Sequence, residues 1–378
     1  MAGLDFSSKI EEVSKTIEFP EQMLSSGLVQ PNQSTNSSSR KLMFAVHRQH
    51  CFPLMNAEKA IIETGYENRF GDYSSSITRA DSDYTVIAKI SKFNFAPNHH
   101  YWIIFRSNQT GMLDVIERIS YHHITESYGY LYNNEYLDQL SIGDVVPKGT
   151  VIQKSLAFDE FNNRKDGVNF NVAYLALDDN MEDSIIFSDK ATEKLVSPLI
   201  KPVKIMINDN DIPLNIYGDD KIYKVFPDIG EEVKDGQLIA LRKEKKEESY
   251  YNQSVDRLRK VMMSDDKRQV TGKVIDVNIY CNNPDILDSH YYAQIKLYYD
   301  ELQRSSKQIV QTLLPYAAQN IPMTYELQKI FANTKRVMNK DPYIDKRSFS
   351  NIILEIDVLE ELRINAGDKA SNRYGVMC

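Results

Sequence analysis

Short apolar runs separated by turn-forming residues dominate the sequence between about residues 70 and 240. The runs YTVIAKI, YWIIF, NVAYLAL and SIIF are rich in Ile, Val, Tyr and Phe, and Gly, Asn and Asp separate them. Runs of this length and composition are typical of β-strands. We therefore expect mainly β-structure in this part of the chain.

The pattern changes twice towards the C-terminus. Around residues 286 to 316 the apolar positions recur near i, i+3, i+4 and i+7, which predicts an amphipathic helix. Alternation returns in NIILEIDVLEEL at 351–362 and predicts a strand. At the other end, the polar stretch 26–39 lacks a hydrophobic period, so we expect a loop after a short N-terminal helix.

One pattern occurs twice, as IGDVVPKG at 142–149 and IGEEVKDG at 229–236. In each copy two glycines lie six positions apart, and an apolar run follows. This arrangement favours a tight turn with backbone at positive φ before a strand. A biotinyl or lipoyl carrier would place a Lys flanked by Met on such a hairpin, and neither copy has one, so two structural turns are the simpler interpretation.

Composition narrows the class of protein. The chain has 378 residues, 42% hydrophobic and 26% charged, which is enough for two or three globular domains. We find no apolar run near the ~20 residues of a membrane helix and no secretion signal, so we expect no membrane and a cytoplasmic location. Three widely spaced cysteines indicate neither a disulfide framework nor a zinc site. The net charge of −8 argues mildly against a nucleic-acid partner.

Two charged clusters could carry chemistry. Acidic residues gather within the segment 171–195, where neighbouring carboxylates attract a metal or a basic group, although a solvated acidic turn is the plain alternative. Near the C-terminus, Lys369 and Arg373 lie four apart in the glycine-flanked INAGDKASNRYG (364–375). Such a pair suits a phosphate, and a surface loop is the alternative.

Other candidates are weaker. The string Gly218-Asp219-Asp220 matches the metal-binding hairpin of palm-type polymerases, but no earlier strand offers a convincing partner aspartate. Adjacent histidines at 99–100 and 122–123 point to opposite faces of a strand, so each pair is a poor chelate. The run 242–248 has mixed charge and indicates a solvated segment. The tyrosine-rich stretch 291–299 more plausibly covers a core than stacks on bases.

Several segments together resemble the beta subunit of multisubunit DNA-dependent RNA polymerases. SRKLMFAVHRQHCFPL resembles that family's Asn-Arg-Ala-Leu-Met stretch, DNMEDSIIFSD its Asn-Phe-Glu-Asp-Ser-Ile, and INAGDKASNRYG its Gly-Asp-Lys-Met-Ala-Gly-Arg-His-Gly. Three further segments lie between them in the family's order: IETGYENRF, SIGDVVPKGTVI and TGKVIDVNIY. The resemblance covers roughly residues 39 to 377 and rests on six collinear pieces.

The resemblance implies a β-rich α+β fold that contains part of a double-psi beta barrel. It divides the chain into an N-terminal helix and polar loop (1–38), a first part of the barrel (39–205), a wall or flap insertion with the amphipathic helix (206–350), and the truncated start of the barrel's return (351–378).

It also implies roles for five residues. Glu182 and Asp183 would face the nucleotide triphosphate and its Mg²⁺, Lys369 and Arg373 would contact RNA near the 3′ end, and Arg40 would reach the incoming triphosphate. The family's metal-binding Asp-x-Asp-x-Asp is absent, so a beta-prime-like partner would hold Mg²⁺. Other beta-like fragments, template DNA, RNA and nucleotides complete the expected partners, and we expect the chain to be inactive alone.

Departures from the family matter as well. Val376, Met377 and Cys378 stand where the family continues with Asn-Lys-Gly, so a second active-site Lys is missing. The Arg48-Gln49 pair lies one place early, and we assign Arg48 no role. Divided subunits of this kind resemble those of giant bacteriophages, which would place the protein in a bacterial host. A structural subunit of the same fold that has lost catalysis is an open alternative, and so is an interrupted gene.

Overall fold

The computed structural model describes residues 25–96, 99–123, 128–175, 184–208, 211–242, 266–338, 343–344, 347–348 and 351–374. The chain divides into two compact units. Unit 1 comprises Met1–Ile77, Ser155–Pro198 and Leu362–Cys378, and unit 2 comprises Thr78–Lys154 and Leu199–Glu361. Each unit is described by itself.

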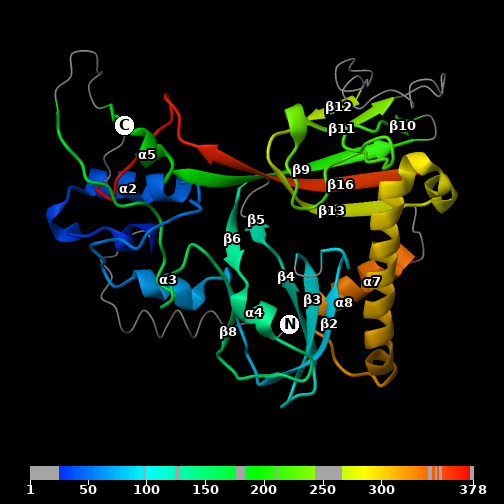
Figure 1. The fold of residues 1–378 in the computed structure, drawn as a ribbon. Coiled ribbons are helices and arrows are strands. Elements are labelled where there is room, and N and C mark those ends of the chain that lie inside the picture. Colours follow the sequence, from blue (N-terminus) through cyan, green and yellow to red (C-terminus); the bar gives the residue numbers. More distant parts are fainter. Residues whose placement is uncertain are drawn as a thin grey trace. The chain divides into compact units, whose positions relative to one another are not determined.

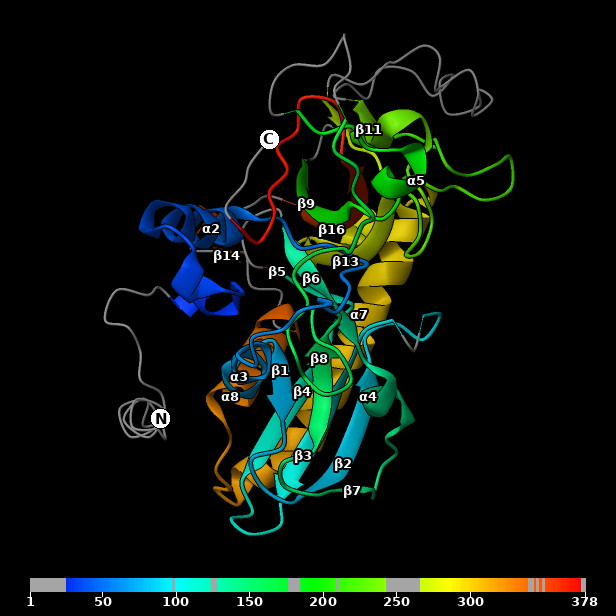
Figure 2. The ribbon, with the colours of Figure 1, turned by 90° about the vertical axis from the view of Figure 1, so that its left-hand side faces the viewer.

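Unit 2 contains an antiparallel sheet of order β4-β3-β2-β7; Figure 1 labels β2, β3 and β4, and Figure 2 also labels β7. Its strands are β2 (Tyr84–Ser91), β3 (Tyr101–Ser107), β4 (Leu113–Arg118) and the short β7 (Val145–Val146). Buried and half-buried positions alternate along β2, as expected for a strand with two different faces. Apolar side chains from this sheet enter two separate clusters, so both faces of the sheet are used.

One of these clusters joins the sheet to two helices, α7 (Ala293–Ala318) and α8 (Tyr325–Met338) (Figure 2). Ile309 and Leu313 of α7 and Leu327 of α8 pack with Ile104 and Leu113 of the sheet. The other cluster packs the sheet against α4 (Glu135–Gln139) and β8 (Val151–Ser155). The amphipathic helix predicted around 286 to 316 is confirmed as α7, whereas α8 was not predicted.

Helix α7 begins later than the sequence suggests. Residues Pro284–Asp288 and His290–Tyr292 form two short 3-10 helices before it. Ser289 between them has extended backbone, which interrupts the helical hydrogen bonds. The tyrosines near its start do serve the core: Tyr292, Tyr298 and Tyr299 are buried in a large apolar cluster.

A three-stranded sheet has the order β13-β16-β9 (Figure 1) and supplies ten of the 22 buried residues of that cluster. Its strands are β9 (Val196–Ile207), β13 (Lys273–Cys281) and β16 (Ile352–Arg363). Strand β16 confirms the strand predicted at 351–362 and lies between the other two, although it is last in sequence. Strands β13 and β16 are antiparallel, with Asp276 directly opposite Asp357.

Three further sheets contain the remaining strands that the structure describes. One has the order β1-β8-β6-β5, from β1 (Ile77–Arg79), β5 (Tyr121–His123), β6 (Gly129–Asn133) and β8 (Val151–Ser155). Another has the order β10-β11-β12, from β10 (Ile212–Pro213), β11 (Gln237–Arg242) and β12 (Asp266–Gln269). The third pairs β14 (Tyr343–Ile344) with β15 (Arg347–Ser348).

Both copies of the repeated glycine pattern form the expected turns. Gly143, Gly149, Gly230 and Gly236 all have positive φ, between 69° and 95°. The first copy leads into β8, and the second leads through a short 3-10 helix (Lys234–Gly236) into β11. The local sequence was therefore sufficient to predict these turns.

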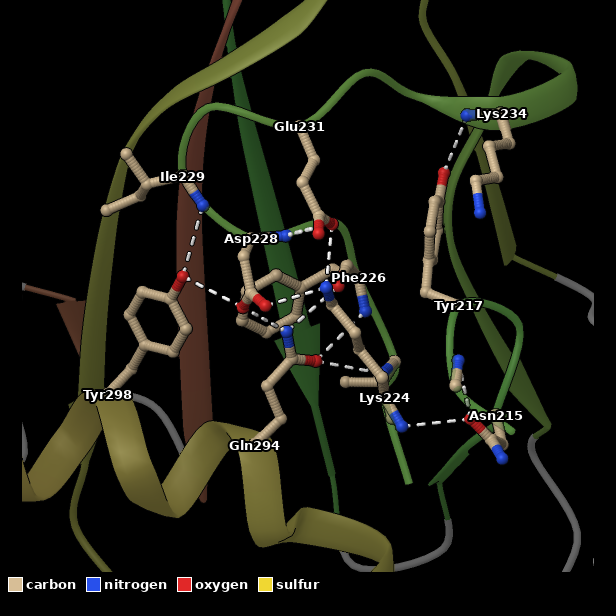
Figure 3. Close-up of polar contacts among 12 residues, drawn as sticks. Asn215, Tyr217, Lys224, Phe226, Asp228, Ile229, Glu231, Lys234, Gln294 and Tyr298 are labelled. Carbon is tan, nitrogen blue, oxygen red and sulfur yellow. Dashed lines mark hydrogen bonds and ion pairs between the residues drawn. The ribbon is translucent and has the colours of Figure 1, made fainter. Parts of the chain in front are cut away.

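The second turn is fixed to α7 by a buried polar network (Figure 3). The Gln294 side chain accepts hydrogen bonds from the Val225 and Phe226 amides and donates to the Phe226 carbonyl and to Asp228. The Tyr298 hydroxyl donates to Asp228 as well and accepts from the amide of Ile229. Buried polar groups are thereby satisfied where the turn meets the helix.

Unit 1 contains short helices joined by long irregular segments. Its helices are η1 (Ser25–Val29), η2 (Gln33–Thr35), α2 (Ser38–His50), α3 (Glu67–Tyr73) and α5 (Asp189–Thr192). The expected loop 26–39 is thus partly 3-10 helical. The predicted N-terminal helix before this stretch lies outside the described residues.

The strands predicted at NVAYLAL and SIIF are wrong where the structure describes them. Residues 171–175 and 184–187 lie outside every strand, and Val172, Tyr174 and Ile186 are between 65% and 97% exposed. A strand needs a neighbouring strand to pair its backbone groups, and the described residues supply none here. The α+β class is confirmed, with antiparallel sheets, while the double-psi barrel and the domain boundaries stay predictions.

Candidate functional site

Helix α2 carries Arg40 in its first turn. Ser37 caps the helix, because its hydroxyl accepts a hydrogen bond from the Arg40 amide at 3.4 Å. Phe44 and Ala45 form the buried face, while the Arg40 side chain is exposed and its Nη1 lies 3.7 Å from Met43 Sδ. The helix contains no acidic residue. It therefore presents a positively charged face.

Lys369 and Arg373 lie in the segment that follows β16. Asp368 closes a turn here by accepting a hydrogen bond from the Asn365 amide at 2.8 Å, and Gly367 has a φ of +96°. Lys369 is exposed. Arg373 is half-buried and donates from Nη1 to the Ile62 carbonyl at 2.6 Å.

Two further contacts hold this segment within unit 1. The Ile364 amide donates to the Leu195 carbonyl at 3.3 Å. Ser371 Oγ lies 3.3 Å from Nδ1 of His47, which is on α2. The segment that carries Lys369 and Arg373 is therefore in contact with the helix that carries Arg40. The family resemblance assigned Arg40, Lys369 and Arg373 to one expected site, but it did not indicate that their segments touch. The structure adds this contact.

Arg48, to which the sequence assigned no role, is a structural anchor of unit 1. Its side chain is 9% exposed, and its Nε donates to Asp166 at 2.7 Å. Its guanidinium also lies 4.7 Å from the Phe70 ring centroid. Burial opposes ionisation of Asp166, but Arg164 and Arg48 outweigh it and hold the pKa of that carboxyl below its usual value. Arg48 thus ties α2 to the segment around residue 166.

Glu58 lies at the base of the segment that carries the acidic cluster. Its Oε1 accepts from Lys194 at 2.8 Å, and its Oε2 accepts from the Asn169 amide at 3.0 Å. The sequence gave no sign of this arrangement, because Glu58 is more than 100 positions from both partners.

The predicted acidic cluster lies outside the part of the chain that the structure describes. Glu182 and Asp183 lie outside the described residues, as do Asp178 and Asp179. Residues 243–248 of the mixed-charge run 242–248 also lie outside the described residues. The roles given to Glu182 and Asp183 therefore stay predictions.

The Gly218-Asp219-Asp220 string forms an irregular turn rather than two paired strands. The exposed Asp219 carboxylate accepts from the amides of Lys221 and Ile222, both at 2.8 Å, and these bonds hold its pKa below the usual value. The Asn215 side chain accepts from the Gly218 amide at 3.0 Å (Figure 3). Asp219 thus has a local structural role.

A buried charged cluster in unit 2 was missed from the sequence. Lys92, with a side chain 3% exposed, lies 2.6 Å from Asp276. His100 lies 2.6 Å from Glu117 through Nε2 and 3.8 Å from Asp276 through Nδ1. Burial, followed by the charge of Asp276, raises the pKa of Asp357 to about 6. The sequence did contain a sign that Lys92 is buried. Every second residue of β2 from Tyr84 to Ile90 is buried, and Lys92 occupies the next position of this alternation.

The described residues do not contain a candidate metal site. Among them, three or more His, Cys, Asp or Glu side chains do not come together in an arrangement that could hold a metal ion. His99 and His100 contact the Ile275 carbonyl and Glu117 instead. Within the same residues, no helix is long and apolar enough to cross a membrane.

Comparison with known proteins gives one consistent result. No established family profile matches the sequence. The DNA-directed RNA polymerase subunit beta of Chlamydia pneumoniae is 26% identical over 238 residues, which is 61% of this chain and 17% of the relative. That of Chlamydia muridarum is 26% identical over 234 residues, with the same coverage.

A third relative comes from outside the bacteria named above. The subunit beta of Helicosporidium sp. subsp. Simulium jonesii is 27% identical over 172 residues, or 43% of this chain and 12% of the relative. The chain thus spans less than a fifth of the length of the curated relatives it matches. Over about three fifths of its own length it is similar to the beta subunits of DNA-directed RNA polymerases.

Proposed function

We propose that this chain is a catalytic-core segment of a beta-like subunit of a multisubunit DNA-directed RNA polymerase. In this role it positions the nucleotide and the RNA 3′ end for nucleotidyl transfer. The observation that carries the proposal is the similarity to beta subunits, together with the contact between the Lys369–Arg373 segment and α2. We further propose a divided form like that of giant bacteriophages, acting in the cytoplasm of a bacterial host.

In this proposal the chain contributes fixed positive charges that stabilise the reacting phosphoryl group. Developing negative charge on a transferring phosphoryl group is stabilised by fixed cations. Lys369 is exposed, and Arg373 carries several N–H donors of which one contacts Ile62. Arg40 in the basic α2 would approach the triphosphate of the incoming nucleotide. Both cation-bearing segments belong to unit 1.

Mg²⁺ is assigned to a partner in this proposal. The sequence lacks the family's Asp-x-Asp-x-Asp, so a beta-prime-like chain with an aspartate triad would hold the ion. Glu182 and Asp183 would face the nucleotide from this chain. Other beta-like fragments, template DNA, RNA and nucleotides complete the assembly.

Reconstitution tests the proposal. The chain is purified with its partners by affinity tag, the partners are identified by mass spectrometry, and nucleotide incorporation is measured for the complex and for the chain alone. We expect incorporation by the complex only. Incorporation by the isolated chain, or co-purification without any polymerase chain, would contradict the proposal.

Point variants of the complex then test the site. Asp183→Ala, Lys369→Ala and Arg373→Ala should each slow incorporation by about 10- to 100-fold, because a charge-assisted contact is worth roughly 1.5–3 kcal/mol. Asp219→Ala and Asp220→Ala are the matched controls and should leave the rate unchanged. If the control variants abolish activity while Asp183→Ala does not, a palm-type mechanism replaces this one.

A specific observation favours one second candidate, a structural subunit of the same fold without catalysis. Unit 1 exposes many large apolar side chains, and the chain has a net charge of −8. Under this alternative the complex would still incorporate nucleotide when Asp183, Lys369 and Arg373 are replaced.

A further inference from the structure

A cluster of charged side chains joins two sheets within unit 2. Lys92, directly after β2, donates to the two carboxylate oxygens of Asp276 on β13 at 2.6 and 2.7 Å. The next residue, Phe93, is fully buried in the apolar cluster to which β13 contributes. His100, directly before β3, lies 2.6 Å from Glu117 of β4 and 3.8 Å from Asp276. The four-stranded sheet is therefore held to β13 by charges as well as by apolar contacts.

Both ring nitrogens of His100 face a carboxylate. Nε2 contacts Glu117, and Nδ1 faces Asp276. A neutral imidazole has one N–H donor and one lone pair, whereas the imidazolium has an N–H donor on each nitrogen. The charged form therefore presents a donor to both carboxylates, while the neutral form places a lone pair against one of them.

The titratable and charged groups around His100 come from the elements packed against it. They are Lys92 after β2, the adjacent His99, Glu117 and Arg118 of β4, Tyr121 of β5, Asp276 of β13, and Glu355 and Asp357 of β16. Burial lowers the pKa of His99 to about 4 and raises the pKa of Tyr121, so both are neutral near pH 7. Arg118 and Glu355 each have an ion-pair partner outside this cluster.

His100 and Asp357 change charge near neutral pH. Burial and the charge of Lys92 oppose protonation of His100, but its bonds to Asp276 and Glu117 outweigh them and raise its pKa. Asp357 lies directly opposite Asp276, and burial, followed by that charge, raises its pKa to about 6. While both hold their protons, the cations Lys92 and His100 balance the anions Asp276 and Glu117. Once both protons are lost, one cation faces three anions.

We propose that His100 is a proton-operated latch: its imidazolium ties the four-stranded sheet to β13 through Asp276, and loss of the proton loosens this joint. A group whose pKa is higher in the fold than in the unfolded chain stabilises the fold below its unfolded pKa, and this stabilisation is lost as the pH rises through the folded value. The latch is therefore closed in mild acid and weakened in mild base. It operates whether or not the chain acts in a polymerase.

Titration of the full chain by NMR tests the charge state of His100. The ring signal of His100, assigned by its absence in His100→Gln, should titrate with a midpoint above the ordinary value of 6.5. Glu117→Gln should lower this midpoint, because it removes one of the two carboxylates. His290→Gln, which replaces an exposed histidine of the same unit, should leave it unchanged. A midpoint at or below 6.5 in the parent would overturn the proposal.

Amide hydrogen exchange tests whether this proton holds the joint. The Lys92 amide donates to the His100 carbonyl at 3.0 Å, and the Gly143 amide donates to the Val86 carbonyl at 2.9 Å near the start of β2. After correction for the intrinsic pH dependence of exchange, protection of the Lys92 amide should fall by about 10-fold from about pH 5.5 to about pH 8.5, because a charge-assisted contact is lost. Protection of the Gly143 amide should fall less. Equal falls at both amides indicate a general loss of stability and overturn a local latch.

Variants assign the fall in protection to His100. In Asp357→Asn, which removes the second titrating group, protection of the Lys92 amide should still fall with pH, and adding His100→Gln should abolish the fall. A fall that survives in the double variant contradicts the latch, and so does a raised His100 midpoint with protection that is independent of pH. If the double variant does not fold, Glu117→Gln serves instead: it should move the fall to lower pH, and a fall at the parental pH would overturn the proposal.

Discussion

The two units of this chain are stabilised in different ways. Unit 2 contains the large apolar clusters described above and the buried Lys92–Asp276 pair. Among the described residues, unit 1 has fewer buried apolar side chains, such as Phe44 and Phe158, and several ion pairs between loops, such as Lys194–Glu58, with side chains 51% and 34% exposed. Exposed pairs contribute only about 0–1 kcal/mol each. We therefore expect unit 1, which carries Arg40, Lys369 and Arg373, to be the less stable of the two units.

Unit 1 also exposes many large apolar side chains. In unit 1 they occur on α2, in the loop after it, and along the segments before residue 176 and after residue 183. The large ones are Leu42, Met43, Val46, Phe52, Ile61, Ile62, Leu156, Phe161, Val172, Tyr174, Leu175, Ile185, Ile186 and Tyr374. Exposed apolar surface of this extent is typical of a surface that binds another macromolecule. Functional segments are commonly drawn from the less stable parts of a protein, and unit 1 fits that pattern.

The largest effect should come from breaking the buried pair of unit 2. Lys92→Met leaves Asp276 buried without its closest cation, and should lower the free energy of unfolding by about 3–5 kcal/mol. Trp102 of β3 is the single tryptophan, so its fluorescence during denaturation reports on unit 2. Lys201→Met is the control, because its partner Glu360 and its own 41% exposed side chain form a surface pair worth about 1 kcal/mol at most. Lys201 also lies in unit 2, so equal losses in the two variants would show that burial does not set the cost of breaking an ion pair, and the contrast with the exposed pairs of unit 1 would lose its basis.

A smaller effect should depend on pH. The pKa of Asp357 is about 6 in the fold, above the unfolded value of about 3.9, so folding favours its protonated form. Its contribution to stability is therefore full below about pH 4 and is lost as the pH rises to 6. Asp357→Asn should match the parent at pH 4 and exceed it by about 1–3 kcal/mol at pH 7.

Denaturation at several pH values, followed through Trp102, checks this expectation. Asp276, Lys92 and Glu355 are the charged groups around Asp357, and all three are retained in the variant. The exposed Asp288, which pairs with Lys296, provides the control Asp288→Asn. A difference between Asp357→Asn and the parent that stays constant from pH 4 to pH 7 would contradict the assignment.

The smallest effect should come from the exposed face of α2. Leu42→Gln and Val46→Gln should change the stability of unit 1 by less than about 0.5 kcal/mol, since both side chains are more than 40% exposed. Phe44→Ala on the buried face should cost about 3–5 kcal/mol. Hydrogen exchange of the α2 amides measures both. If Leu42→Gln destabilises α2 as strongly as Phe44→Ala, the exposed face has a packing partner within the chain.

Local signals in the sequence predicted local structure well. Strand β16 and helix α7 followed from apolar periodicity, and the four turn glycines followed from the need for positive φ. The runs NVAYLAL and SIIF were wrongly predicted as strands. Their composition suits a strand, but a strand also needs a neighbouring strand to pair with, and composition does not reveal whether one is present. Helix α8 went unpredicted although one of its faces packs with α7.

The candidate site was less accessible to prediction. Arg40 came from a resemblance to a family, whereas Lys369 and Arg373 came from their spacing as well as from that resemblance. Nothing in the sequence indicated that α2 contacts the C-terminal segment. Glu58, Asn169 and Lys194 are individually ordinary residues that gain a role only when distant segments meet. Lys92 was different, because its place in the alternation of β2 marked it as buried.

The turn at Gly218 shows why a short string can mislead when it is read as a sign of ancestry. A Cβ atom there would lie 1.9 Å from the Ile222 carbonyl oxygen and 2.7 Å from the Lys224 nitrogen, so only glycine fits. The next position must accept two amide hydrogen bonds, which favours aspartate. The steric and hydrogen-bonding requirements of this one turn are thus enough to favour Gly followed by Asp. The same letters can therefore arise independently in proteins that share neither descent nor chemistry.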